Sequence, residues 1–180
     1  MHLNSYKNFS FDRGRSKLVE IAWILVGGIA FSTWLPGSWW RLILLRLFGA
    51  KIGVGNVIKP YVRVKFPWKL FIGDYCWVGE NVWIDNLDAV VLKNNCCISQ
   101  GTYLCTGSHD WTKDTFDLII KPIVICDHVW IGAFSRIAPG VVVGEGTVCT
   151  LGSVLNKSTG EWEIWSGNPC FNIKMRSSVV

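Results

Sequence analysis

A small or aliphatic residue returns every six positions along most of this chain. The repeat is clearest between residues 125 and 155, where glycine follows it in Ile131-Gly132 and Val143-Gly144. A period of six fits neither an α-helix, with 3.6 residues per turn, nor a plain amphipathic strand, with two. It fits a triangular prism in which each hexapeptide forms one flat face and points its first residue inward. Repeats of this kind stack into a solenoid.

The same phase extends toward the N-terminus and predicts about five coils of three faces. The period breaks after Val64, Ile84 and Leu104, always behind the third face, and the longest break contains His109. One edge of the prism therefore carries every insertion, and we expect function there. The predicted inward positions are Ile52, Ile58, Val64, Ile72, Val78, Ile84, Leu92, Ile98, Leu104, Ile125, Ile131, Ile137, Val143, Cys149 and Leu155.

Composition narrows the class of protein. The 180 residues suffice for one domain with an N-terminal extension. The net charge of +5 is interpreted as modest and spread out, and no Lys/Arg block favours nucleic acid. Eleven tryptophans and a mean hydropathy of +0.30 favour a large buried interface, a membrane surface, or both. Seven cysteines without a Cys-x-x-Cys pair are predicted to be mostly small core residues, present as thiols in the cytoplasm, with zinc ligation or disulfides as the alternatives.

Residues 1–50 are predicted to be an extension and residues 51–157 the solenoid, with its histidine-bearing loop at 105–124 and a C-terminal cap and tail at 158–180. Within the extension we expect a flexible basic arm over 1–17, an apolar helix within 18–35 and an amphipathic helix over 39–48 with Ser38 as its N-cap. The apolar run is at the short limit for a membrane span and contains Glu20. Residues 18–48 either pack on the solenoid or a neighbouring subunit, or lie in the membrane interface, which would place the protein on the inner face of the membrane.

Three segments carry a family resemblance: Phe48-Gly-Ala-Lys-Ile-Gly53, Tyr103-Leu-Cys-Thr-Gly-Ser-His-Asp110 and Gly167-Asn-Pro-Cys170. Together with the hexapeptide array they resemble the left-handed β-helix acyltransferases, in particular the colanic acid and exopolysaccharide biosynthesis acetyltransferases. The resemblance covers roughly residues 40–176. It implies an all-β, left-handed parallel β-helix, a homotrimer with clefts between subunits, acetyl-CoA as co-substrate and a sugar or glycan acceptor. The chain departs from the family pattern at Lys93 and Cys126, where glycine normally follows the repeat aliphatic residue.

The predicted catalytic residues are His109, Asp110 and Ala133. A loop imidazole suits proton removal from a hydroxyl at neutral pH. The resemblance implies direct attack on the thioester without an acyl-enzyme. Asp110 either orients the ring or the acceptor, or is a solvated loop charge. The Ala133 N–H is the expected oxyanion donor, because relatives use the residue three after the matching Trp130.

The predicted binding residues divide between acceptor and CoA. Asp85, Asn86 and Trp130 are expected to contact the acceptor or line its pocket. Small residues permit close approach of the pantetheine arm, and cations suit its phosphates. The expected CoA contacts are Gly132, Ala133, Gly152, Ser153, Lys157, Lys174 and Arg176. No metal is expected.

The sequence favours O-acetylation of a sugar hydroxyl and leaves other functions open. These are N-acetylation of an amino sugar or nucleotide sugar, transfer of a longer acyl chain from acyl carrier protein, and a non-catalytic solenoid scaffold. The γ-class carbonic anhydrases share the fold but need three histidines to hold zinc. This chain offers only His109 and a surface-facing His128 in the solenoid, with His2 in the arm, so we set that function aside.

Overall fold

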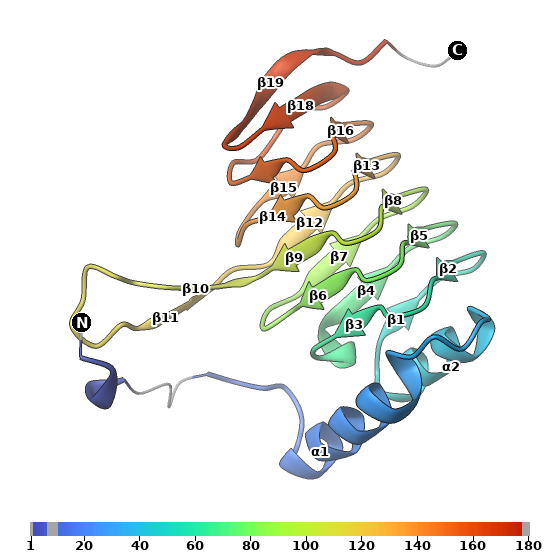
Figure 1. The fold of residues 1–180 in the computed structure, drawn as a ribbon, viewed down its shortest axis with the longest axis vertical. Helices are drawn as coiled ribbons and strands as arrows, with labels where there is room; N and C mark the ends of the chain where they lie inside the picture. The colour runs from blue at the N-terminus through green and yellow to red at the C-terminus, as the bar shows by residue number, and fades with distance from the viewer. Residues whose placement is uncertain (1, 7–10, 178–180) are drawn as a thin grey trace.

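The computed structural model describes residues 2–6 and 11–177. Its body is a left-handed parallel β-helix whose coils stack along one axis, from the helices at one end to a terminal hairpin at the other (Figure 1). Face A contains β1 (Lys51–Ile52), β4 (Leu70–Ile72), β7 (Val90–Leu92), β12 (Ile123–Ile125) and β15 (Val142–Val143). Face C contains β3 (Arg63–Val64), β6 (Trp83–Asp85), β9 (Tyr103–Cys105), β14 (Arg136–Ile137) and β17 (Val154–Leu155).

Face B is the longest sheet and closes the far end of the solenoid. Its parallel strands are β2 (Val57–Ile58), β5 (Trp77–Val78), β8 (Cys97–Ile98), β13 (Trp130–Ile131), β16 (Val148–Cys149) and β18 (Glu163–Gly167). The last strand, β19 (Cys170–Met175), pairs antiparallel with β18. The described strands thus form five complete coils and part of a sixth. Residues 161–176 leave the six-residue phase, because this hairpin ends the stack.

The predicted inward positions form the core. All are buried except Ile52, which is half-buried beside the helices. Equivalent positions stack in register from coil to coil, as Ile72 does on Leu92 and Leu92 on Ile125. Each buried aliphatic side chain contributes about 1.5–3 kcal/mol to folding. The hexapeptide period is therefore confirmed as the pattern that builds the core.

All three predicted breaks lie at one edge, which we call the C–A corner because the chain there passes from face C to face A. The first break holds the short helix η3 (Pro67–Lys69) and the second is a tight turn. The third is a hairpin of β10 (Gly107–His109) and β11 (Leu118–Ile120). Figure 1 shows this hairpin projecting sideways, well clear of the solenoid.

Helices cap the first coil. The helix α1 (Lys17–Val26) runs into a π-helical turn, η2 (Gly27–Phe31), and α2 (Trp39–Leu47) follows. The apolar stretch 18–35 is therefore helical only as far as Phe31. Trp23 is 3% exposed and its indole donates to the Val64 carbonyl at 2.9 Å, so α1 is fixed to face C. No described helix is long and apolar enough to cross a bilayer.

Two polar residues, Arg41 and Ser38, fix the helices in place. The Arg41 side chain is fully buried and donates to the carbonyls of Phe31, Thr33, Leu35 and Gly37. Ser38 is the N-cap residue of α2, as predicted, but its side chain makes no capping hydrogen bond. Its hydroxyl instead bonds the backbone of Ile58 at 3.0 and 3.2 Å. The predicted N-cap is thus a link between α2 and the first coil.

The described parts of the predicted basic arm contact the hairpin and the first coil. The His2 N–H donates to the Asp114 carbonyl at 2.9 Å, so the short helix η1 (Leu3–Ser5) lies at the hairpin tip. Near residue 13, the Trp68 indole donates to the Arg13 carbonyl at 2.6 Å. Residues 1 and 7–10 of the predicted arm lie outside the described residues, as do residues 178–180 of the predicted tail.

Every cysteine is a free thiol. Cys76, Cys96, Cys149 and Cys170 are buried, and the other three are half-buried. Across residues 2–6 and 11–177, no group of three or more His, Cys, Asp or Glu side chains is placed to hold a metal ion. The cysteines therefore act as small core and face residues in this fold.

Candidate active site

His109 ends β10 with its ring half-buried on the projecting hairpin. Its Nδ1 lies 2.8 Å from the Phe116 carbonyl oxygen. A carbonyl only accepts hydrogen bonds, so Nδ1 must carry the proton in this contact. The lone pair of the neutral ring then lies on Nε2. This arrangement gives the imidazole the form that a general base requires.

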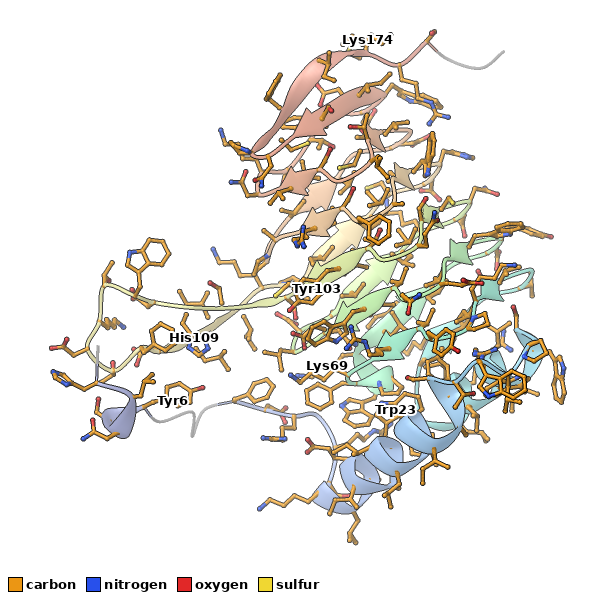
Figure 2. All side chains as sticks on the ribbon, in the orientation of Figure 1. Tyr6, Trp23, Lys69, Tyr103, His109 and Lys174 are labelled. Carbon is orange, nitrogen blue, oxygen red and sulfur yellow. The ribbon has the colours of Figure 1, made fainter. Side chains whose placement is uncertain are left out.

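Two aromatic rings hold the imidazole. The Phe116 ring stacks on it with 4.2 Å between centroids and an angle of 1°. The Tyr6 ring meets it edge-on at 5.6 Å and 63° (Figure 2). Phe116 has a φ of 50°, a left-handed conformation that is uncommon outside glycine. Through this turn a single residue supplies both the carbonyl and the stacking ring to His109.

Asp110 does not orient the ring. Its carboxylate accepts from the Thr112 N–H at 3.0 Å and the Thr112 hydroxyl at 2.6 Å, and Lys113 lies 4.0 Å away. The hydrogen bonds from Thr112 lower the pKa of Asp110. The carboxylate thus shapes the hairpin tip, and the Phe116 carbonyl has the orienting role that we had considered for Asp110.

Asp85 lies at the base of the hairpin. Its backbone carbonyl accepts from the Thr106 hydroxyl at 3.0 Å, just before β10 begins. Its carboxylate accepts from the Tyr103 hydroxyl at 2.8 Å and lies 3.1 Å from the Lys65 ammonium. Burial raises the pKa of the Tyr103 phenol, and hydrogen bonds to Cys105 and Asp85 add to the shift. Tyr103 therefore remains a protonated donor to Asp85.

Asn86 has a structural role, which corrects its predicted contact with the acceptor. The residue is fully buried. Its amide oxygen accepts from the Phe66 N–H at 2.9 Å, and its amide nitrogen donates to the Phe66 carbonyl at 2.7 Å. Both polar groups of the side chain are therefore used to hold the preceding coil at the C–A corner.

The predicted pocket residues Trp130, Gly132 and Ala133 line one groove on face B. It encloses about 300 Å³ and is also lined by Ser99, Gln100, Val148, Cys149, Thr150 and Leu151. Trp130 is 49% exposed, and its indole donates to the Ser99 hydroxyl at 2.9 Å. A Cβ on Gly132 would lie 2.7 Å from the Leu151 nitrogen. Glycine is therefore required there for the next coil to approach.

The backbone of the groove offers a donor at the B–C corner, where the chain passes from face B to face C. The neighbouring N–H groups of Gly132 and Phe134 donate to Cys149 and Gln100 at 2.7 and 2.9 Å. Within the described part of the chain, the Ala133 N–H has no hydrogen-bond partner. Directly above, the Gly152 N–H donates to the Ala133 carbonyl at 2.8 Å, and nothing lies within 4 Å of where its Cβ would be.

Ser153 and Arg176 do not reach this groove, which corrects two predicted CoA contacts. Ser153 is fully buried, and its hydroxyl accepts from the Gly167 N–H at 3.2 Å. The Arg176 guanidinium donates to the carbonyls of Gly146 and His128 at 2.7 and 3.3 Å, at the opposite edge of face B. Lys157 follows β17 and Lys174 lies on β19, and both are exposed.

Within one chain the hairpin that carries His109 and the groove on face B are apart, and we call them the two halves of the site. The groove lies at the B–C corner, whereas the hairpin leaves from the C–A corner and projects outward (Figures 1 and 2). His109 and Asp85 therefore belong to one half, and Trp130 with Ala133 to the other.

Sequence reasoning missed four residues of these two halves. Phe116 and Tyr6 surround the imidazole, and Tyr103 and Lys65 contact Asp85. The sequence could have indicated Tyr103 as a site residue, because it is the first residue of the motif that contains His109. Its position also faces outward one coil above Trp83. Tyr6 had none, since it lies more than 100 residues from His109 along the chain.

A left-handed hexapeptide-repeat β-helix with a histidine-bearing hairpin and an open groove defines the class of hexapeptide-repeat acetyltransferases. Two solved structures share this fold. An acetyltransferase of this class from Vibrio cholerae O1 biovar eltor, VCA0836 in complex with acetyl coenzyme A, superposes with a TM-score of 0.83 at 22% identity, over 93% of each chain. A galactoside acetyltransferase in complex with coenzyme A gives 0.78 at 22% identity, over 88% of this chain and 80% of the other.

Sequence comparison identifies the branch of this class. The chain is 41% identical over 168 residues to the Escherichia coli K12 protein named for acetyl transfer in colanic acid biosynthesis, WcaF, covering 92% of this chain and 91% of the relative. The galactoside O-acetyltransferase of the same organism is 27% identical over 133 residues, covering 72% and 66%. A scan of protein-family models found no match. The chain belongs to the hexapeptide-repeat acetyltransferase family that contains WcaF.

Proposed function

We propose that this acetyltransferase transfers the acetyl group of acetyl-CoA to a sugar hydroxyl in exopolysaccharide or surface-glycan biosynthesis, with His109 as general base. The observation that carries the proposal is the bond from His109 Nδ1 to the Phe116 carbonyl, which places the lone pair of the neutral imidazole on Nε2. The names of two relatives, one for colanic acid biosynthesis and one for galactoside O-acetylation, support a sugar acceptor.

The chemistry follows from the two halves. His109 Nε2 takes the proton of the acceptor hydroxyl as the oxygen attacks the thioester carbonyl. The Ala133 N–H donates to the oxyanion that develops on the carbonyl oxygen. When the tetrahedral intermediate collapses, the carbon–sulfur bond breaks and the leaving thiolate takes the proton from His109. General-base catalysis of this kind contributes about 10²–10⁴-fold to the rate.

Asp85 is our proposed contact for the acceptor. Its carboxylate lies beside the root of the histidine hairpin, and Tyr103 and Lys65 hold it in place. An ionised carboxylate accepts hydrogen bonds, which is what a sugar hydroxyl offers. Trp130 and Gly132 would line the path of the pantetheine arm, and the exposed Lys157 and Lys174 remain proposed partners of the CoA phosphates.

We also propose that the working form is a homotrimer in the cytoplasm. Attachment of this trimer to the inner face of the membrane is a separate proposal. The projecting hairpin supports the oligomer. In one chain the hairpin with His109 starts at one edge of face C and the groove lies at the other edge, so a second chain would be needed to bring them together. Free thiols throughout the chain are typical of a reducing compartment.

The test is release of free thiol from acetyl-CoA in the presence of mono- and oligosaccharide acceptors, amino sugars included. His109→Ala should lower acceptor-dependent release by two or more orders of magnitude. His128→Asn is the matched control, since it removes the other solenoid imidazole at a residue whose φ of 60° suits asparagine. It should retain activity.

The outcomes separate the alternatives. O-acetylated product identifies a sugar hydroxyl as the acceptor group, whereas acetylation of amino sugars alone would replace this function with N-acetyl transfer. Unchanged release by His109→Ala would remove His109 as the base. No release with any acceptor, together with no binding of acetyl-CoA, would favour a non-catalytic scaffold.

A further inference from the structure

The helices at the end of the solenoid present an apolar surface to solvent. α1 buries Trp23 but exposes Leu18, Ile21 and Leu25, and α2 exposes a second stripe at every fourth residue. We call this surface the helical end face. Its large apolar side chains, each at least 44% exposed, are Leu18, Ile21, Ile24, Leu25, Ile29, Trp34, Leu35, Trp39, Ile43 and Leu47. Surface helices of soluble proteins normally turn polar side chains outward, so this surface calls for a partner.

Charge is concentrated at the same end of the molecule. Residues 13–73 contain ten lysines and arginines and one acidic residue, Glu20, which is paired with Arg13. The rest of the chain contains eight basic and twelve acidic residues. The interpretation of an evenly spread charge was therefore wrong. Exposed cations on the helices, the chain leading to them and the first coil include Arg15, Lys17, Arg46, Lys51 and Lys59.

We propose that the helical end face docks on an anionic lipid bilayer. Apolar side chains, tryptophans and surrounding cations form the combination that places a helix in the membrane interface. The ten-residue α1 is too short to span a bilayer and suits a position parallel to its surface. Nucleic acid would match the cations but not the apolar stripes.

A second copy of the chain is the weaker occupant. A symmetric contact would place this face against itself. Exposed cations such as Arg15, Lys17 and Arg46 would then meet their own copies, and like charges repel. Anionic lipid headgroups instead neutralise them.

Docking in this way leaves the active site accessible. The helical end face lies at the end of the solenoid axis, whereas the hairpin with His109 projects sideways (Figure 1). On the proposed function, this orientation holds the active site just above the membrane surface. The acceptor would then be a glycan carried by a membrane lipid.

The test is co-sedimentation of the full chain with phosphatidylcholine vesicles and with mixed phosphatidylcholine–phosphatidylglycerol vesicles. We expect binding to the mixed vesicles at low salt and weaker binding to the neutral ones. The double variant Ile21→Glu with Ile43→Glu should lower the partition coefficient at least tenfold. Ile173→Glu is the matched control, since Ile173 is 54% exposed and Ile21 55%, but Ile173 lies on β19 at the far end. It should bind like the wild type.

A second pair of substitutions tests the charges without adding acids. Lys17→Gln and Lys51→Gln change exposed side chains and should each weaken binding to mixed vesicles about fivefold. Absence of wild-type binding at low salt would overturn the proposal, as would equal binding by the double variant. Light scattering completes the test, because a smaller oligomer in the double variant would assign the face to contacts between copies instead.

Acetyl transfer to a soluble acceptor is measured on the same samples. Docking variants should retain transfer, and His109→Ala should retain docking. Failure of docking and failure of the proposed function are thereby distinguished.

Discussion

At the scale of single residues, one carbonyl determines which nitrogen of His109 carries the proton. The Phe116 oxygen lies 2.8 Å from Nδ1, and the Phe116 ring covers the imidazole at 4.2 Å. Asp110, the nearest carboxylate in sequence, is instead occupied by Thr112. The hairpin thus orients its histidine with a backbone group and a ring, and it needs no charged partner to do so.

Phe116→Leu should lower kcat about tenfold with little change in KM. The variant keeps the carbonyl but removes the ring, and an aromatic stack of this kind contributes about 0.5–1.5 kcal/mol. Steady-state kinetics with acetyl-CoA and the best acceptor measure the effect. Trp111→Leu, at the exposed tip of the same hairpin, should leave kcat unchanged. An equal loss in both variants would mean that the hairpin as a whole had been disturbed.

Asn86→Ala should destabilise the fold without changing the KM for the acceptor. The substitution strips the buried N–H and carbonyl of Phe66 of their partners, which costs about 3 kcal/mol and lowers Tm by roughly 10 °C. Calorimetry measures the stability, with the exposed Asn156→Ala as control. A raised KM with unchanged Tm would restore the acceptor contact that the sequence suggested.

At the scale of elements, the coils fit because small residues stand where backbones meet. Gly132 turns the chain away from β13 directly beneath the backbone of residues 149–151. Ala133, which follows in the same turn, lines the groove and has a backbone N–H without a partner among the described residues. The turn at residues 132–133 therefore contributes both to the packing of neighbouring coils and to the proposed oxyanion donor. A substitution that disturbs this packing should also displace the donor.

Gly132→Ala should lower both stability and affinity for acetyl-CoA. Its new Cβ would stand 2.7–2.8 Å from the backbone of residues 149–151, and overpacking of this kind costs about 1–3 kcal/mol. Thermal unfolding and acetyl-CoA titration measure the two effects. Gly28→Ala is the control, because nothing lies within 4 Å of that Cβ and it should be neutral or stabilising. If Gly132→Ala bound acetyl-CoA with wild-type affinity, the packing of the coils at Gly132 would not contribute to binding.

The sequence predicted what depends on periodicity and missed what depends on distant contacts. The inward residues and the insertion corner follow from a period of six, because every coil repeats the same geometry. Asn86 and Ser153 looked like surface polar residues, since their backbone partners belong to another coil or to the terminal hairpin. Tyr6 could not be placed, because no local pattern brings the arm to the hairpin.

At the scale of the whole molecule, three regions differ in character. The helical end face is apolar and cationic, the hairpin carries the base, and the groove lies on a separate face. In the proposed trimer each active site takes its hairpin and its groove from different chains. Inactive chains that are defective in different halves should therefore repair one another.

Mixing His109→Ala chains with Trp130→Ala chains, after dissociation and reassembly, should restore activity. In a random equal mixture, about one quarter of the sites combine an intact hairpin with an intact groove. Thiol release should then approach roughly a quarter of the wild-type rate. Each variant reassembled alone is the control and should stay inactive. A mixture as inactive as its parts would place both halves of the site in the same chain.

The confinement of every insertion to the C–A corner has a consequence for where this fold can vary. Faces A, B and C must keep their six-residue rhythm, because each side chain there stacks on its equivalents in neighbouring coils. The hairpin at residues 107–120 is not bound by this repeat, because its two strands pair with each other. This loop can therefore change in length or sequence while the six-residue repeat of the solenoid stays the same.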